Sequence, residues 1–342
     1  MNYKICWLTL NRACNLQCKW CYAKDTKYSK TDDMDIKMAK DIIDICSDLK
    51  IPHITLIGGE PTIYPHLKEV ILYCHSKNIS CGIVTNGIKL ADEDFLHSMF
   101  EVDQKSFSIS LKGENKGAFK ATTGKDMFDT ALKGISNCLK NGINPTVSMV
   151  LTEENIDSFI EGVKTLKDIG VKRFHFSFCY EFAVNTECKE YLSKNNPKIL
   201  VKKFIEHYPE LDRITEGNFE LFETFPLCIW DISIIEMMNK KNQIKTVCQL
   251  LHRSGLIFDS KGNLLPCNAM PSIKLGRLYR DFFTAKELLK LSETSHIKKV
   301  YDKLCSVPDI TCLQCNNYNN CGGGCVCHWT NYNFDTLQKM EI

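Results

Sequence analysis

Apolar runs alternate with amphipathic stretches along the first half of the chain. Six short apolar segments rich in β-branched and aromatic residues predict strands, and the stretches between them have the helical period. The expected strands are 4–10, 53–59, 80–86, 105–111, 144–151 and 171–178, and the expected helices are 34–49, 66–77, 92–99, 126–141 and 156–169. Strands separated by helices favour a parallel sheet, which right-handed crossovers curl into a barrel. We therefore expect an α/β fold with a partial (β/α)6 TIM-like barrel over residues 1–180.

Composition and charge narrow the classes of partner. The 342 residues are 44% hydrophobic and 25% charged, which is ordinary globular usage, and the net charge of +2 offers no basic excess for nucleic acid. No apolar run reaches the roughly 18 residues that a membrane span needs, and the N-terminus does not have the pattern of a signal peptide. We expect a cytoplasmic protein with no nucleic acid or membrane partner. In a reducing cytoplasm the 19 cysteines, crowded towards both ends of the chain, favour metal binding over a disulfide framework.

Three cysteines follow the first expected strand with the spacing C-x3-C-x2-C: Cys14, Cys18 and Cys21. Structural zinc sites close with four ligands, so this trio is a poor zinc site. An iron–sulfur cluster held by three thiolates keeps coordination sites open on one iron. The alternative is that these cysteines only pack in the core. Catalytic groups of barrels lie on loops after the strands, which is where this trio stands.

Further motifs follow the next three expected strands. The second strand ends in GGEP, residues 58–61, which is read either as a site where the backbone approaches a ligand beside a carboxylate or as a plain Gly-Gly turn. The third ends in VTNG, residues 84–87, although Asn-Gly is also a commonplace turn. The fourth carries Ser108 and Ser110, which share one face by the two-residue period.

The cysteine spacing, the GGEP motif and the aromatic residue before the last cysteine together resemble the radical S-adenosylmethionine (SAM) enzymes. This resemblance implies that Cys14, Cys18 and Cys21 hold a 4Fe-4S cluster whose open iron takes the amino and carboxylate groups of SAM. It also implies SAM contacts from Trp20, Gly58, Gly59, Glu60, Pro61, Thr85, Asn86, Ser108 and Ser110. The pattern departs from the family at Lys112, where many relatives carry Asp.

A second group of cysteines occupies the C-terminal third. Cys248 is followed by Gly262 and Cys267, and further on stand Cys312, Cys315, Cys321 and Cys325, with Cys327 beyond. This spacing resembles the SPASM domain, which holds two auxiliary 4Fe-4S clusters; a zinc ribbon made of Cys248, Cys267, Cys312 and Cys315 is the alternative.

The resemblance also implies a grouping of these ligands. It puts Cys248, Cys267 and Cys325 on the first auxiliary cluster with Cys228, and Cys312, Cys315 and Cys321 on the second. The fourth place of the second is filled by Cys327, by His328 or by no protein ligand, and we expect Cys327. The expected domains are the barrel over 1–180, a helical linker over 181–227 and the auxiliary cluster domain over 228–342.

The resemblance implies an activity as well. A radical SAM enzyme cleaves SAM reductively to a 5′-deoxyadenosyl radical, which abstracts a hydrogen atom from the substrate. We expect the substrate to be a ribosomally made peptide, in which a residue is crosslinked, oxidised or epimerised. The alternatives are an oxidoreductase of a small molecule such as a sugar or cyclitol, and a non-catalytic iron–sulfur protein that transfers electrons or senses redox state.

The expected partners and one further candidate residue complete the prediction. A flavodoxin or ferredoxin-type protein is the expected reductant. Because the first expected strand begins close to residue 1, a peptide leader is expected to be read by a separate protein or directly in the barrel mouth. Cys179, at the end of the sixth expected strand, is the candidate hydrogen donor to a substrate radical, with core packing as the alternative.

Overall fold

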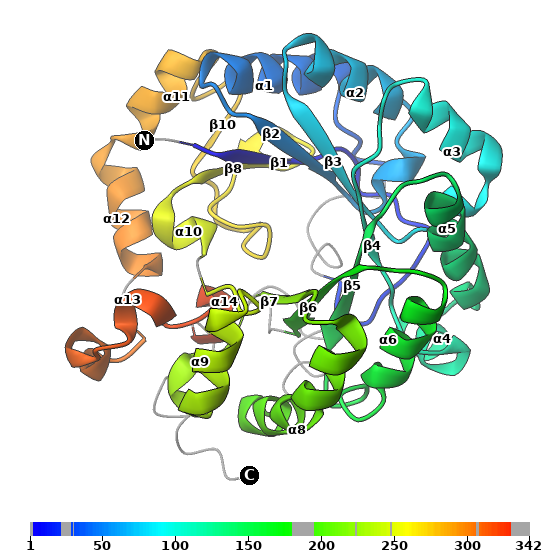
Figure 1. Ribbon diagram of the computed structural model, residues 1–342. Helices are drawn as coiled ribbons and strands as arrows, with labels where there is room; N and C mark the ends of the chain where they lie inside the picture. Colours follow the sequence, from blue (N-terminus) through cyan, green and yellow to red (C-terminus); the bar gives the residue numbers. More distant parts are fainter. Residues whose placement is uncertain are drawn as a thin grey trace.

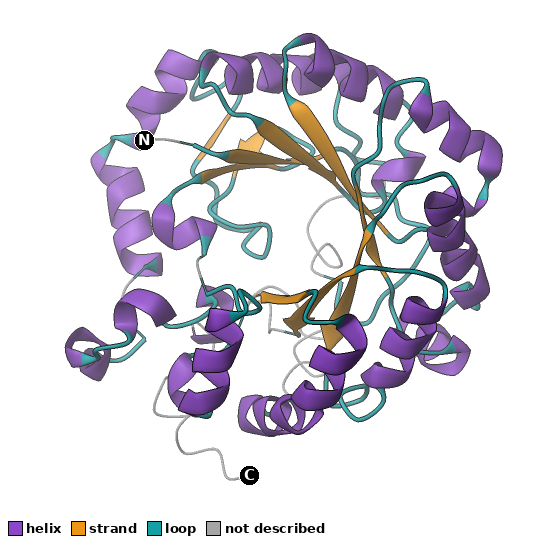
Figure 2. Ribbon diagram, viewed as in Figure 1, coloured by secondary structure: helices purple, strands orange, loops and turns teal. Residues whose placement is uncertain are grey.

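A curved sheet surrounded by helices makes up the computed structural model of the protein (Figures 1 and 2). The structure describes residues 3–21, 29, 31–179, 195–222, 224–246, 248–305 and 308–329. The strands of the first half are β1 (Ile5–Thr9), β2 (His53–Ile57), β3 (Ser80–Thr85), β4 (Phe107–Ser110), β5 (Thr146–Leu151) and β6 (Arg173–Phe178). They pair in sequence order, each parallel to the next, so the partial barrel predicted from the sequence is confirmed.

The second half of the chain extends the same sheet at both edges. Strand β7 (Phe219–Phe222) pairs in parallel with β6, and β8 (Gly255–Phe258) pairs in parallel with β1. Two short antiparallel strands, β9 (Asn263–Leu264) and β10 (Gly276–Arg277), follow β8. Within the described residues the sheet therefore has ten strands in the order β10-β9-β8-β1-β2-β3-β4-β5-β6-β7. The sequence prediction named only the six central strands.

Helices cover the convex face of this sheet (Figure 1). In the first half they are α1 (Ile36–Asp48), α2 (Leu67–Ser76), α3 (Glu93–Phe100), α4 (Lys116–Thr123), α5 (Phe128–Lys140) and α6 (Phe159–Asp168). The second half has α8 (Pro197–Thr215), α9 (Ile232–Lys240), α10 (Gln249–His252), α11 (Ala285–Ser292), α12 (Ser295–Leu304), α13 (Tyr318–Cys321) and α14 (Val326–Trp329). Single 3-10 turns are η1 (Pro61–Ile63), η2 (Lys89–Ala91), η3 (Leu227–Ile229) and η4 (Ile310–Gln314). None of the helices in the described part of the chain combines the length and apolar character needed to cross a bilayer.

The alternation of side chains along β6 separates the two faces of the sheet. The ring of Phe176 lies 5.6 Å from that of Phe159 in α6, and the ring of Phe178 lies 5.8 Å from that of Phe204 in α8. Both strand residues are buried, so they form part of the core between sheet and helices. The two-residue period therefore directs His175 and Ser177 to the concave face.

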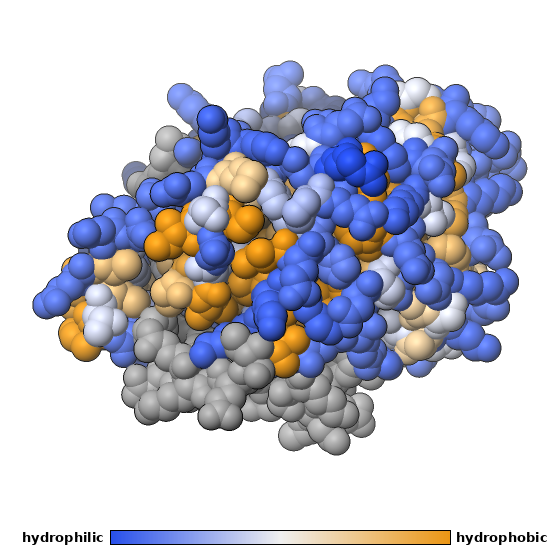
Figure 3. All heavy atoms as spheres, turned by 60° about the horizontal axis from the view of Figure 1, so that its bottom comes forward, coloured by the Kyte–Doolittle hydropathy of each residue, from blue (hydrophilic) through white to orange (hydrophobic). Residues whose placement is uncertain are grey.

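Apolar side chains also reach the surface of the second half. Ile232 of α9 and Ile310 and Leu313 of η4 are 67%, 72% and 65% exposed. Figure 3, which turns the lower side of Figure 1 forward, shows apolar areas interrupting a largely hydrophilic surface.

Candidate active site

The cysteine loop after β1 is held against the Gly-Gly pair after β2. The backbone N–H of Gly59 donates to Asn11 O at 2.9 Å, and the N–H of Glu60 donates to Ala13 O at 2.8 Å. A Cβ on Gly58 would lie 2.1 Å from Asn11 Oδ1, and one on Gly59 would lie 2.2 Å from Ala13 O. Both glycines are therefore required for close approach of two backbones. This places the GGEP motif directly beside the segment that leads into Cys14.

The carboxylate of Glu60 is buried and joins two motifs. Its Oε1 accepts hydrogen bonds from Thr62 N at 3.1 Å, Thr62 Oγ1 at 2.6 Å and Thr85 Oγ1 at 2.6 Å. Its Oε2 accepts one from Asn86 N at 2.8 Å. Burial raises the pKa of Glu60, although these hydrogen bonds oppose the shift. Since a carboxylate oxygen can accept more than one hydrogen bond, Oε2 retains capacity for a further donor.

Two asparagines beside the cysteines complete this network. Asn86 Nδ2 donates to Asn15 Oδ1 at 2.6 Å, which ties the turn after β3 to the residue following Cys14. Asn11 Nδ2 donates to Glu60 O at 2.9 Å, and among the described residues its buried Oδ1 has no hydrogen-bond partner. Neither Asn11 nor Asn15 was predicted from the sequence, where the one sign of a role is their position on either side of Cys14.

The three thiols of the loop share one environment. The pKa of Cys14 is raised to about 11, chiefly by burial, with smaller contributions from the nearby Glu60, Cys18 and Cys21. Burial also raises the pKa of Cys18, which Lys112 lowers and Cys21 raises. Trp20, which precedes Cys21, is buried, and so is Pro61 at the start of η1.

The chemistry of these groups fits a cluster that binds SAM. The thiols supply the donors that iron requires, while Glu60 Oε2 and Asn11 Oδ1 are acceptors that suit an ammonium group. As the side chains stand, the described residues contain no group of three or more His, Cys, Asp or Glu that would hold a metal ion.

Polar side chains form a row across the concave face of β4 to β7. Strand pairing aligns Ser110 with Ser148, Ser148 with His175, and His175 with Glu220. His175 Nε2 lies 3.0 Å from Glu220 Oε2, and Lys245 Nζ lies 3.1 Å from Glu220 Oε1. Burial lowers the pKa of His175, while Glu220 raises it. The predicted SAM contact Ser110 accepts a hydrogen bond from Lys112 Nζ at 2.6 Å, and Ser108 is half-buried on the same strand face.

Cys179 directly follows β6. Its thiol is buried and its backbone N–H donates to Leu151 O at 2.9 Å. By the alternation of β6 it lies on the same side as His175 and Ser177. Its role as a hydrogen donor stays a prediction.

One set of C-terminal cysteines gathers around η3. The N–H of Leu227 points at Cys321 Sγ from 3.3 Å, which puts Cys321 beside Cys228. The pKa of Cys228 is raised to about 11, chiefly by burial, with smaller contributions from the nearby Cys321, Cys312 and Cys315. The first set therefore comprises Cys228, Cys312, Cys315 and Cys321.

A second set gathers around the start of α14. The buried thiol of Cys327 is hydrogen-bonded with Cys267 and Cys325, and these contacts raise its pKa well above the usual value. The pKa of Cys248 is raised to about 12, chiefly by burial, with smaller contributions from the nearby Cys325 and Cys267. The second set therefore comprises Cys248, Cys267, Cys325 and Cys327. This grouping differs from the one that the resemblance implied, because Cys228 and Cys327 have exchanged places. The ring of His328, the other candidate ligand, packs 4.1 Å from that of Phe225.

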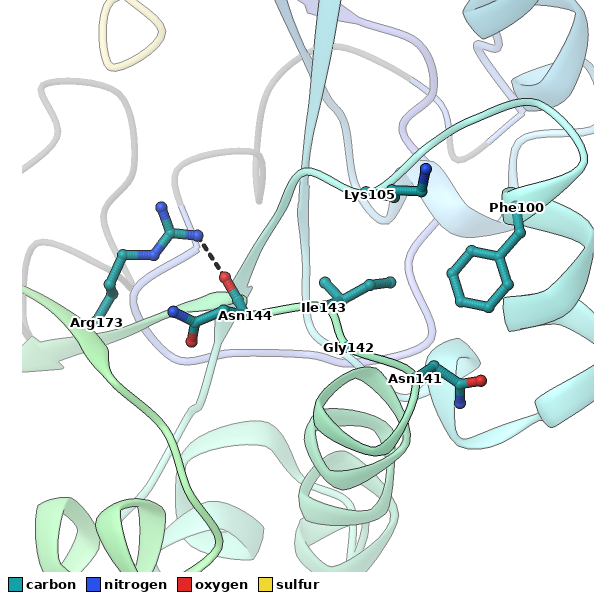
Figure 4. Close-up of a pocket in the computed structure, with 7 residues that line it drawn as sticks. All are labelled: Phe100, Lys105, Asn141, Gly142, Ile143, Asn144 and Arg173. Carbon is teal, nitrogen blue, oxygen red and sulfur yellow. Dashed lines mark hydrogen bonds between the residues drawn. The ribbon is translucent and has the colours of Figure 1, made fainter.

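A cavity of about 600 Å³ lies at the amino ends of the strands, away from the motifs described above (Figure 4). It is lined by residues at or before the starts of β4, β5 and β6: Phe100, Lys105, Asn141, Gly142, Ile143, Asn144 and Arg173. The guanidinium of Arg173 donates to Asn144 O across its wall (Figure 4). The sequence motifs all lie at the carboxyl ends of the strands, so this cavity is separate from the candidate site.

Comparison with known proteins agrees with these motifs. Residues 8–166 match the model of the radical SAM superfamily. Fe-coproporphyrin III synthase of Methanosarcina barkeri is 31% identical over 147 residues, which are 43% of this chain and 37% of that protein. Mycofactocin maturase MftC of Mycolicibacterium smegmatis is 29% identical over 153 residues, 44% of this chain and 38% of its own. The match thus spans less than two fifths of each of these curated relatives.

Solved structures resemble nearly the whole chain. Streptococcus suis SuiB bound to its precursor peptide SuiA superposes with a TM-score of 0.71 at 20% identity, covering 95% of this chain and 72% of SuiB. The structure of anSMEcpe with bound AdoMet superposes with a TM-score of 0.70 at 17% identity, covering 98% of this chain and 95% of anSMEcpe. At these identities the likeness concerns the fold.

Proposed function

We propose that this protein is an enzyme that cleaves SAM reductively and abstracts a hydrogen atom from a substrate, because residues 8–166 match the model of the radical SAM superfamily. The observation that carries the proposal is the buried network from Glu60 through Asn86 to Asn15. These hydrogen bonds connect the GGEP motif, the turn after β3 and the cysteine loop. A protein that only transfers electrons has no need of such an arrangement beside its cluster.

The residues of this chain divide the work of the SAM site. Cys14, Cys18 and Cys21 hold a 4Fe-4S cluster and leave one iron open, and the cluster with bound SAM supplies the 5′-deoxyadenosyl radical. Glu60 and Asn11 receive the ammonium of SAM, since both offer acceptor oxygens beside the loop. Lys112 contributes positive charge near Cys18.

We propose a ribosomally made peptide as the substrate. SuiB was crystallised with a precursor peptide and MftC is a maturase, and both resemble this chain. The row of Ser110, Ser148, His175 and Glu220 gives the concave face hydrogen-bonding groups that suit a polar backbone or side chain. A flavodoxin or ferredoxin-type protein supplies the electron, and a separate protein or the barrel mouth reads the leader. Cys179 is the proposed hydrogen donor where the product is an epimer.

The C-terminal cysteines are proposed to hold two auxiliary 4Fe-4S clusters. Eight thiols in two sets of neighbours supply the number and type of ligand that two cubanes require.

A small molecule is the second candidate substrate, because Fe-coproporphyrin III synthase is 31% identical over its matched part. The test incubates reduced enzyme and SAM with the short peptides encoded beside its gene and follows their mass. Loss of two hydrogens indicates crosslinking or oxidation, and deuterium uptake from heavy water without other change indicates epimerisation. Unchanged peptides together with turnover of a sugar, cyclitol or porphyrin would reject the peptide assignment.

A further inference from the structure

The chain makes a sharp reversal between Cys321 and Cys325. Gly322, Gly323 and Gly324 lie between them with φ of +57°, +81° and +73°, a left-handed region that side chains rarely adopt. A Cβ on Gly324 would lie 2.5 Å from Thr224 O, so this turn presses against the segment leading to η3. The N–H of Cys325 also donates to Thr224 O at 2.8 Å.

This reversal sends the two neighbouring cysteines to different places. Cys321 ends α13 and meets the N–H of Leu227, one residue before Cys228. Cys325 stands one residue before α14, and with Cys327 it faces Cys267, which lies beyond β9. Each of the two sets therefore draws its thiols from separate segments: η3, η4 and α13 for one, and the ends of β9, α10 and α14 for the other.

We propose that Cys228 completes a four-thiolate site with Cys312, Cys315 and Cys321, and that Cys327 completes a second with Cys248, Cys267 and Cys325. This rests on the proposed auxiliary clusters and reverses the places of Cys228 and Cys327 that the family resemblance implied. Four thiolates saturate a cubane. Neither auxiliary cluster then has an iron open to substrate, so the substrate is held by side chains of the barrel and the two clusters are limited to electron transfer.

Iron counts of paired variants test the grouping. Replacing two ligands of the same cluster should cost about four irons, as replacing either one alone does. Replacing one ligand of each of two clusters should cost about eight irons. From about twelve irons in the reconstituted parent, we expect about eight in Cys228→Ala/Cys312→Ala and about four in Cys228→Ala/Cys248→Ala. The pair Cys327→Ala/Cys267→Ala is expected to retain about eight, and Cys327→Ala/Cys312→Ala about four. Cys305→Ala is the matched control, since this half-buried cysteine belongs to neither set, and it should keep all its iron.

The opposite pattern, with about eight irons in Cys228→Ala/Cys248→Ala and about four in Cys228→Ala/Cys312→Ala, would restore the expected family grouping. Full iron in Cys228→Ala or in Cys327→Ala would remove that residue from the ligands. A variant lacking Cys14, Cys18 and Cys21 tests whether the auxiliary clusters exist, separately from how their ligands are grouped. About eight irons in this variant would support the two clusters. Zinc or no metal would reject the clusters themselves.

Unmutated protein gives a second measurement that does not depend on the folding of variants. During stepwise cluster loss to ferricyanide, alkylation of Cys228 should rise together with that of Cys321, and alkylation of Cys327 together with that of Cys267. Exposure of Cys228 in step with Cys248 would contradict the grouping.

Discussion

The side-chain amide of Asn86 donates a 2.6 Å hydrogen bond to Asn15 Oδ1, linking the turn after β3 to the residue that follows Cys14. We expect Asn86→Ala to free the cysteine loop, lower the free energy of unfolding by about 1 kcal/mol and weaken SAM binding. Equilibrium dialysis with SAM and denaturant unfolding measure the two effects. Asn144→Ala, at the amino ends of the strands, is the control and should leave SAM binding unchanged. Equal losses of SAM affinity in both variants would argue against a specific link between Asn86 and the cysteine loop.

Gly59 permits the closest approach in the site. An added Cβ would lie 2.2 Å from Ala13 O and 2.5 Å from Arg12 O, both backbone atoms that cannot turn away. We expect Gly59→Ala to displace the cysteine loop and cost about 3 kcal/mol of stability, with loss of iron from the SAM-binding cluster. In the control Gly117→Ala the new Cβ meets only the Asn115 side chain, at 3.3 Å, so stability should be kept or slightly raised. A fully loaded Gly59→Ala protein would show that the two backbones need not touch.

Glu60 combines a structural and a binding role. In Glu60→Gln an amide N–H2 group replaces one of the two carboxylate oxygens. Donors point at both oxygens of Glu60, and the N–H2 group cannot accept those that pointed at the oxygen it replaces. We expect a loss of about 2 kcal/mol in stability and SAM binding about tenfold weaker, with the auxiliary iron kept. Calorimetric titration with SAM and thermal unfolding separate the two effects. Unaltered SAM affinity would leave Glu60 only its structural role.

The pKa of His175 reports the pairing on the concave face. Burial lowers this pKa, Glu220 raises it and Lys245 lowers it. Glu220→Gln should therefore lower the pKa of His175 further, and Lys245→Met should raise it, as measured by NMR titration of the imidazole. An unfolded histidine has a pKa of about 6.5. With its folded pKa lowered further, His175 of Glu220→Gln binds a proton less readily in the folded than in the unfolded state, so this variant should lose more stability on acidification than the parent. Identical titrations in all three proteins would mean that the ion pair is not formed in solution.

The hydrophobic pattern and the sequence motifs predicted the six central strands and the loops that form the candidate site. The six central strands and the loops after them follow from short apolar runs separated by helices, and these loops bring Cys14, Glu60 and Asn86 together. Strands β7, β9 and β10 were not predicted, because they are only two to four residues long, which is too short for a pattern of their own. They are defined by pairing across the sheet. The neighbours of Cys228 and Cys327 could not be read from linear spacing, because Cys228 lies near Cys321, and Cys327 near Cys267, only through the folding of segments far apart in the chain.

Formation of 5′-deoxyadenosine tests the central claim most directly. Anaerobically reconstituted protein reduced with dithionite should convert SAM to 5′-deoxyadenosine and methionine in equal amounts. Cys18→Ala should form none while keeping about eight of about twelve irons, because only the SAM-binding cluster loses a thiolate. A reduced, iron-loaded protein that leaves SAM intact, or a Cys18→Ala variant that still cleaves it, would contradict this account.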